Sequence, residues 1–188
     1  MYRNFTLCLA MALPLMQSAQ AGEVIPGTDP KTGYRIGYYD GDTPNVIPGA
    51  TLIHTPQAKE LVDKGAVLID VLASKGDGHD PLDGTWPTLP PRTEIAGTTW
   101  LPDVGSGTMD SYLKRYFKTN LEKLAGPPPG KPVIFYCHSK CWMAWNAGVR
   151  AARWGYKQVY WYPSGTDGWS KAKLPLVPAQ TPPAVDMN

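Results

Sequence analysis

Residues 131–146 read KPVIFYCHSKCWMAWN, and this run joins three local patterns. The segment 133–136 is apolar and β-prone, which predicts a buried strand. A helical pattern begins at Trp142, and the short loop between the two elements holds Cys137 and Cys141. A thiol at the end of a buried parallel strand, facing a helix N-terminus, is where α/β proteins tend to keep their chemistry. Cys137 is therefore predicted to be the reactive residue.

Residues 1–21 have the features of a secretory signal peptide. Arg3 gives a weakly positive start, residues 7–16 form an apolar run too short to span a bilayer, and residues 19–21 (AQA) form a small-x-small cleavage pattern. We therefore expect an exported, periplasmic protein that has no membrane attachment once the signal peptide is removed.

The 167 residues that would remain of the 188 are enough for one domain with its own core. Loss of Arg3 lowers the net charge from +2 to +1, which gives no argument for binding nucleic acid or an anionic membrane. Cys8 leaves with the signal peptide, so the exported chain keeps Cys137 and Cys141. Two cysteines are too few for a disulfide scaffold, so the core must stabilise the fold.

Strand and helix patterns alternate along the rest of the chain. Strands are predicted at 51–53, 66–72, 98–101, 133–136 and 158–162. Helices are predicted from Pro56, with Thr55 as N-cap and Gly65 as the closing residue, and at 109–124 and 142–154. This alternation predicts an α/β fold with a mostly parallel central sheet and helices on both faces.

Four segments lack these patterns. Residues 22–50 are predicted to form an irregular N-terminal arm that packs its tyrosines onto the domain. Residues 73–97 are too rich in Gly and Pro for regular structure, and so long a loop is either functional or a cover. Residues 163–169 are predicted to be a turn, and the Pro-rich tail at 175–188 is predicted to be extended. The predicted domain therefore spans residues 51–174.

The loop after Cys137 has features that would activate a thiol. A thiol reacts as the thiolate, so its pKa must be lowered. The backbone N–H groups of residues 138–142 can turn toward the sulfur, and the following helix adds a partial positive charge. The residues expected to form this cradle are His138, Ser139, Lys140 and Trp142. Such a cradle would stabilise a thiolate, a persulfide or a bound oxyanion.

Other residues near the loop leave alternatives open. Cys141 either faces Cys137, where a strained and reducible disulfide can form, or packs under the helix; a plain stabilising disulfide is the non-catalytic alternative. Asp70, at the end of a buried strand, is placed to orient loop N–H groups by capping or to act in catalysis. Asn146 is expected either to hydrogen-bond the loop or to face solvent.

Several of these segments together resemble a single rhodanese-like domain, from about Leu52 to Leu174. The resemblance rests on residues 68–71 (LIDV), 95–98 (IAGT), the strand–Cys–six-residue loop–helix unit, and the closing Val159, Gly165 and Gly168-Trp169. Within that superfamily, CxxxCWMxWNA at 137–147 is similar to the exported CXXCW-motif proteins associated with PQQ-dependent catabolism. Residues 33–35 (GYR), 99–102 (TWLP) and 161–163 (WYP) match as well.

The resemblance implies that Cys137 carries a persulfide and that residues 138–142 form its backbone cradle. It implies a periplasmic accessory to quinoprotein alcohol oxidation, but not that this chain binds PQQ, so no cofactor and no metal are expected. The loop lacks the Gly and Arg common in sulfurtransferases, and Leu72 stands where Arg often follows Asp-Val. A doubly charged anion would therefore have few cationic partners.

Three functions stay open at this point. The first is sulfur transfer through a Cys137 persulfide. The second is dithiol–disulfide exchange with Cys141 as the resolving thiol. The third is a non-enzymatic role in binding a partner or a soft metal, through Cys137, Cys141 and His138 or Met143. The expected partners are a sulfur or thiol donor and acceptor, with an exported quinoprotein dehydrogenase system as the context, and the chain is expected to be a monomer.

Overall fold

The computed structural model describes residues 24–74, 76 and 78–186. The predicted signal peptide at 1–21 lies outside these residues. Among the helices of the described residues, none has the length and apolar character needed to cross a membrane.

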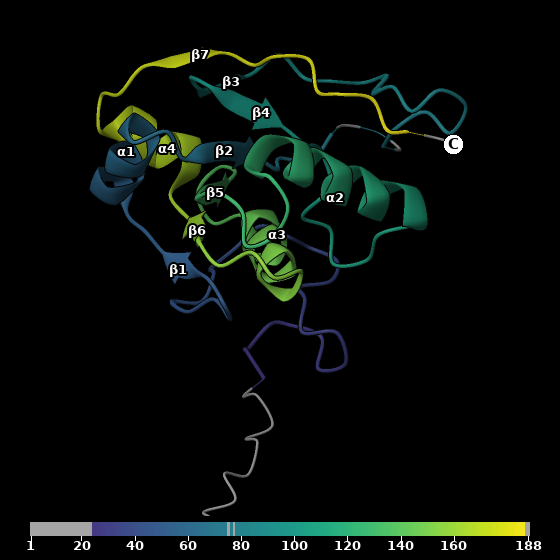
Figure 1. Cartoon of the computed structure of the whole chain (residues 1–188), viewed down its shortest axis with the longest axis horizontal. Coiled ribbons are helices and arrows are strands. Elements are labelled where there is room, and N and C mark those ends of the chain that lie inside the picture. Colours follow the sequence, from purple (N-terminus) through teal and green to yellow (C-terminus); the bar gives the residue numbers. More distant parts are fainter. Residues whose placement is uncertain (1–23, 75, 77, 187–188) are drawn as a thin grey trace, which may run out of the picture.

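A five-stranded parallel sheet forms the centre of the domain (Figure 1). Its order is β1-β6-β5-β2-β4, and every neighbouring pair is parallel. The strands are β1 (Thr51–Leu52), β2 (Val67–Asp70), β4 (Thr98–Trp100), β5 (Val133–Tyr136) and β6 (Val159–Tyr162). All four residues of β5 are buried, as expected for a parallel strand covered on both faces. Asp70, Tyr136 and Tyr162 lie in register, so three strands end at the same edge.

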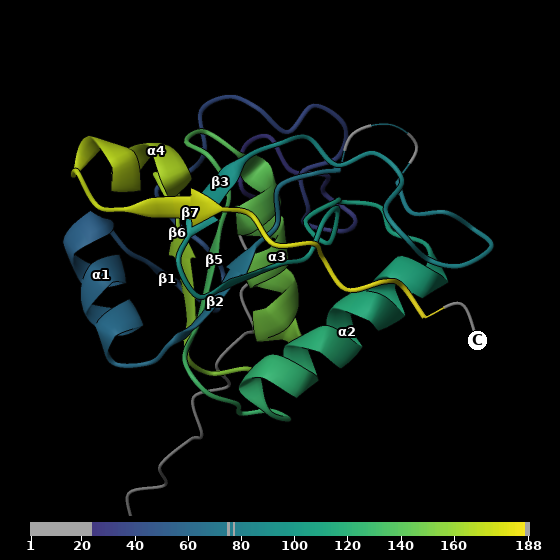
Figure 2. The same cartoon turned by 90° about the horizontal axis from the view of Figure 1, so that it is seen from above.

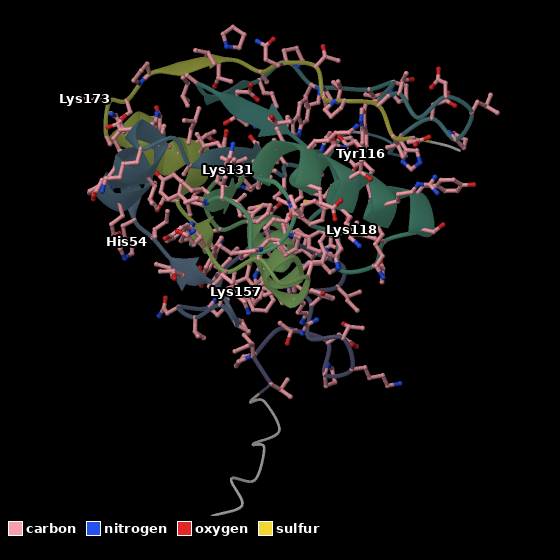
Figure 3. All side chains as sticks on the ribbon, in the orientation of Figure 1. His54, Tyr116, Lys118, Lys131, Lys157 and Lys173 are labelled. Atoms are coloured by element: carbon pink, nitrogen blue, oxygen red, sulfur yellow. The ribbon has the colours of Figure 1, made fainter. Side chains whose placement is uncertain are left out.

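Helices cover both faces of this sheet, which confirms the predicted α/β class (Figure 2). On one face, α2 (Ser111–Ala125) and α3 (Trp142–Arg153) pack Phe117 and Trp145 into a core that includes Phe135. On the other face, α1 (Thr55–Asp63) and α4 (Gly165–Lys171) contribute to a smaller core. Figure 3 shows side chains filling the space between the sheet and its helices, whereas His54 lies exposed at the start of α1.

The start of α1 differs from the prediction by one residue. His54, not Thr55, is the N-cap, and its backbone N–H donates to the Gln57 side chain at 2.7 Å. Thr55 is the first helical residue, and its hydroxyl forms a 2.8 Å hydrogen bond with the Tyr162 hydroxyl. Gln57, the third helical residue, therefore caps the helix start by accepting the His54 N–H, whereas the sequence pattern assigned the cap to Thr55.

Two predictions of irregular structure were wrong in part. Within the loop 73–97, β3 (Thr93–Ile95) pairs antiparallel with β7 (Leu176–Pro178) of the tail. Residues 165–171 form α4 where a turn was expected. Figure 1 shows the tail continuing past β7 beside the loop, where the buried Val185 donates its N–H to the Gly84 carbonyl oxygen at 2.8 Å. The tail therefore packs against the loop.

Candidate functional site

Cys137 and Cys141 lie together at the carboxyl edge of the sheet. Cys137 follows β5 directly, and Cys141 is the N-cap of α3. Both are free thiols and almost fully buried, with 2 % and 3 % of their surface exposed. The two sulfur atoms and a ring nitrogen of His138 all lie within 4.8 Å of one another. Cys141 therefore faces Cys137, which is one of the two placements expected for it.

The surroundings of the two thiols differ. Burial raises the pKa of Cys137 well above its ordinary value, and the hydrogen bond with Cys141 adds to this effect. The hydrogen bond from Cys137 lowers the pKa of Cys141, and the N–H groups of Met143 and Ala144 at the start of α3 lower it further, against the opposing effect of burial. The helix N-terminus therefore favours the thiolate at Cys141, whereas the backbone cradle was expected around Cys137.

Much of the predicted cradle is already bonded to other elements. The N–H and hydroxyl of Ser139 both donate to Asp167 of α4, at 2.9 and 2.6 Å. The Trp142 N–H donates to the Tyr39 carbonyl oxygen at 2.8 Å. The N–H of His138 is directed at the Cys137 sulfur. Ser139 and Trp142 therefore anchor the loop to its neighbours and leave His138 as the backbone donor to Cys137.

The N-terminal arm covers the cysteine loop. Asp40 forms a β-bridge with Cys141, and the Gly41 N–H donates to the Lys140 carbonyl oxygen at 2.9 Å. Two ion pairs join the same segments: His138 Nε2 lies 3.3 Å from Asp40 Oδ1, and Lys140 Nζ lies 2.9 Å from Asp42 Oδ1. The arm thus lies against Cys141 and places a carboxylate beside each basic side chain of the loop.

A cavity of about 310 Å³ lies beneath this part of the arm. Its lining consists of arm residues 37–40, Leu72 and Ala73 after β2, and His138, Cys141 and Met143. Cys141 belongs to this lining and Cys137 does not. Of the two cysteines, Cys141 is therefore the one that borders this cavity.

His138 is engaged on both sides of its ring. Nδ1 lies 2.8 Å from the Ser139 carbonyl oxygen, and Nε2 is the atom paired with Asp40. A soft metal held by the two cysteines and His138 would have to displace one of these contacts.

Asp70 caps the end of β2 and forms a buried ion pair. Its Oδ1 accepts the Leu72 N–H at 2.8 Å, and its Oδ2 bonds Arg92. The Arg92 guanidinium lies 4.5 Å from the centre of the Trp100 ring. Burial raises the pKa of Asp70, and the charge of Arg92 opposes the rise. Arg92 was missed from the sequence, because it lies in a Pro-rich loop with no periodic pattern to place it.

Asn146 bonds neither the cysteine loop nor solvent, so both expectations for it were wrong. It is fully buried, and its Nδ2 donates to the carbonyl oxygens of Arg35 and Gly105 at 2.9 and 2.8 Å. Its Oδ1 accepts the Arg35 N–H at 2.9 Å.

Trp142 also holds the arm, since its indole N–H donates to the Asp42 carbonyl oxygen at 3.1 Å. The arm tyrosines divide: Tyr34 and Tyr39 pack on the core, whereas Tyr38 is 72 % exposed.

Comparison with known protein families gives a match for part of the chain. The family model of the rhodanese-like domain matches residues 95–172. A search of curated proteins found no significant match.

Three solved structures show a similar chain arrangement. A polysulfide-sulfur transferase homodimer from Wolinella succinogenes is 19 % identical, with 69 % of this chain and 79 % of that chain covered and a TM-score of 0.44. A thiosulfate sulfurtransferase from Pseudomonas aeruginosa is 20 % identical, with 73 % and 22 % covered and a TM-score of 0.45. The protein YnjE is 24 % identical, with 70 % and 33 % covered and a TM-score of 0.45. This chain spans about a fifth and a third of the latter two.

The parallel five-stranded sheet with helices on both faces establishes an α/β domain, and the part of it from residue 95 to residue 172 matches the family model of the rhodanese-like domain.

Proposed function

We propose that this chain is an exported sulfur-transfer protein that carries a sulfane sulfur on its Cys137–Cys141 pair in support of PQQ-dependent alcohol oxidation. The observation that carries the proposal is the position of Cys141, whose sulfur lies within 4.8 Å of the Cys137 sulfur and which borders a cavity at the start of α3. The rhodanese-like domain supports sulfur transfer as the reaction. The signal-like residues 1–21 support export, and the CxxxCW motif supports the PQQ context.

The two cysteines take different roles in this proposal. The family resemblance gives the persulfide to Cys137, but the contacts favour Cys141 as the thiolate that meets the donor. The Cys141 thiolate attacks the outer sulfur of a persulfide R–S–SH, the donor S–S bond breaks, and R–S⁻ leaves. An acceptor thiolate then takes the outer sulfur from Cys141–S–SH and regenerates the Cys141 thiolate. Cys137 stabilises that thiolate by hydrogen-bond donation.

Dithiol–disulfide exchange is the second candidate, and the distance between the two sulfurs favours it. The Cys137 thiol can attack the inner sulfur of Cys141–S–SH, which forms the Cys137–Cys141 disulfide and releases H₂S. In this step the Cys137 sulfur is oxidised and the outer sulfur is reduced to sulfide, while the Cys141 sulfur, already oxidised when the persulfide formed, keeps its oxidation level. An external dithiol must then reduce the disulfide before the next cycle.

Intact mass measurement tests the proposal. The reduced chain beginning at Gly22 is incubated with a low-molecular-weight persulfide, and an adduct of about 32 Da, the mass of one sulfur, is expected. Cys141→Ser should lose the adduct, and Cys137→Ser should keep it without releasing H₂S. Absence of the adduct from both the wild-type chain and Cys137→Ser would overturn sulfur transfer, whereas a wild-type chain about 2 Da lighter, with the adduct kept in Cys137→Ser, would favour dithiol–disulfide exchange. Loss of the adduct in Cys137→Ser alone would return the persulfide to Cys137.

Export and context need separate tests. Protein isolated from the periplasm should begin at Gly22, and recovery of the chain in the cytoplasm with Met1 would contradict export. A strain that lacks the protein should grow poorly on an alcohol oxidised by a PQQ-dependent dehydrogenase. The wild-type chain should restore growth and Cys141→Ser should not.

A further inference from the structure

The charges around the cysteine loop are paired before any substrate arrives. Of the two basic side chains of the loop, His138 faces Asp40 and Lys140 faces Asp42. Asp40 itself lines the cavity beside Cys141. An anion in this cavity would therefore meet a carboxylate and find the loop cations already occupied.

The cations outside the loop are also engaged. Arg92 bonds Asp70 beneath the loop. On the arm, Arg35 donates from Nε to the Tyr38 carbonyl oxygen at 2.8 Å and from Nη1 to the Gly27 carbonyl oxygen at 3.0 Å. The fourth carboxylate near the loop, Asp167, accepts from Ser139. Of these two cations, Arg92 is paired with a carboxylate and Arg35 is held by carbonyl oxygens of the arm.

The remaining walls of the cavity are apolar or neutral. Leu72, Ala73 and Met143 supply aliphatic and thioether surface next to Cys141. Tyr39 also belongs to the lining, and its hydroxyl accepts the Gly107 N–H at 2.9 Å. Apolar groups gain about 25 cal/mol for each Å² removed from water, whereas an unpaired charge loses its hydration without compensation.

We infer that the Cys141 cavity selects, as sulfur donors, organic persulfides R–S–SH whose R group is apolar and uncharged, and rejects donors that carry an anionic group beside the reacting sulfur, such as thiosulfate. This inference rests on the proposed sulfur transfer and names its substrate class. The transfer step is the one given above, with R an alkyl or aryl group: the Cys141–S bond to the outer sulfur forms, the donor S–S bond breaks, and R–S⁻ leaves and takes a proton from water. The departing apolar thiol leaves no charge in the cavity once it is protonated.

A matched pair of donors tests the inference. Benzyl persulfide and 4-carboxybenzyl persulfide share the reacting S–SH group and differ by one carboxylate. The rate of adduct formation at Cys141 is measured for each donor. Each rate is divided by the rate at which the same donor transfers sulfur to a small free thiol, which corrects for the different intrinsic reactivities of the donors. The uncharged donor should load at least about tenfold faster, and thiosulfate should load least; tenfold corresponds to about 1.4 kcal/mol.

Charge variants identify the cause of the selection. Asp40→Asn should raise loading by the carboxylated donor and leave benzyl persulfide almost unchanged. Asp63→Asn is the matched control, because this substitution makes the same change in net charge. Asp63 is an exposed residue of α1 that is paired with Lys59. Leu72→Arg, which adds a cation to the wall, should admit thiosulfate, and Leu72→Gln should not.

The outcomes separate the inference from the function on which it rests. Equal normalised loading by the two benzyl donors, with the adduct present in both, would overturn the selection for uncharged donors and leave sulfur transfer standing. No adduct with any donor would overturn the proposed function itself. An equal response of Asp40→Asn and Asp63→Asn would also overturn the inference, because it would assign the selection to net charge.

Discussion

Asn146 of α3 holds Arg35 of the arm through both main-chain polar groups of that residue. Asn146 Oδ1 accepts the Arg35 N–H at 2.9 Å, and Asn146 Nδ2 donates to the Arg35 carbonyl oxygen at the same distance. This pairing lies one helical turn beyond Cys141, the N-cap of α3. Asn146 therefore links the position of the arm to the burial of the two thiols.

Asn146→Ala is expected to loosen the arm and expose Cys141. The substitution leaves three main-chain groups without their partner, and a buried polar group without a partner costs about 1–3 kcal/mol. The free energy of unfolding should fall by about 2 kcal/mol or more, measured by urea denaturation. The rate of Cys141 alkylation in native conditions should rise several-fold.

Asn120→Ala is the control for that experiment. Asn120 makes one hydrogen bond, to the Tyr116 carbonyl oxygen at 2.9 Å, within α2. Its loss should cost about 1 kcal/mol or less and should leave Cys141 alkylation unchanged. Equal alkylation rates in the two variants would show that Asn146 does not control access to the thiol.

Gly165→Ala is expected to disrupt the cysteine loop. A Cβ at Gly165 would lie 1.9 Å from the Cys137 carbonyl oxygen, and the residue has φ of +49°. Gly65→Ala isolates the contact, because Gly65 also has positive φ, +84°, but open space around its Cβ position. Gly65→Ala should lower the free energy of unfolding by about 1 kcal/mol, and Gly165→Ala should lower it by several times as much. Similar melting temperatures for the two variants would contradict the required close approach at Gly165.

The parts of the fold that the sequence predicts well are those with local periodic signals. The apolar residues of β5 and β2 indicate strands buried on both faces, and both lie in the centre of the sheet. The spacing of Leu113, Phe117 and Leu121 indicates the helix α2, and all three are buried. The spacing and type of apolar residues are sufficient to predict these elements because each pattern lies within one short segment of the sequence.

The parts that could not be predicted depend on partners distant in sequence. β3 is a strand because β7, about 80 residues later, pairs with it, and neither segment has a strand pattern of its own. Arg92 pairs with Asp70, which lies 22 residues earlier in the chain. The placement of the α3 N–H groups at Cys141 required the loop conformation, including the positive φ of Lys140. Sequence spacing brings the two thiols together but does not distinguish their environments.

Removal of residues 175–188 is expected to destabilise the domain, although the resemblance ends near Leu174. The truncation deletes β7 and Val185, and it removes the Pro183 carbonyl oxygen that accepts the Trp86 indole N–H at 2.9 Å. Burial of Val185 alone is worth about 1.5–3 kcal/mol. The urea midpoint should fall well below that of the full chain. An unchanged midpoint would support a domain that ends at residue 174.

Cys137→Ala is expected to raise the pKa of Cys141, whereas Cys137→Ser is expected to preserve it more closely. The hydrogen bond from Cys137 is the largest cause of the lowered Cys141 pKa, and a serine hydroxyl can replace the thiol as donor while a methyl group cannot. Because alkylation requires the thiolate, a lowered pKa moves the onset of Cys141 alkylation to lower pH, and a raised pKa moves it to higher pH. The measurement is the rate of Cys141 alkylation by iodoacetamide from pH 5 to 10, located by peptide mapping. At pH 7 the rate in Cys137→Ala should be several-fold lower than in Cys137→Ser, and the two rates should converge at high pH. Identical pH profiles would mean that the helix N-terminus, with the N–H groups of Met143 and Ala144, activates Cys141 without help from Cys137.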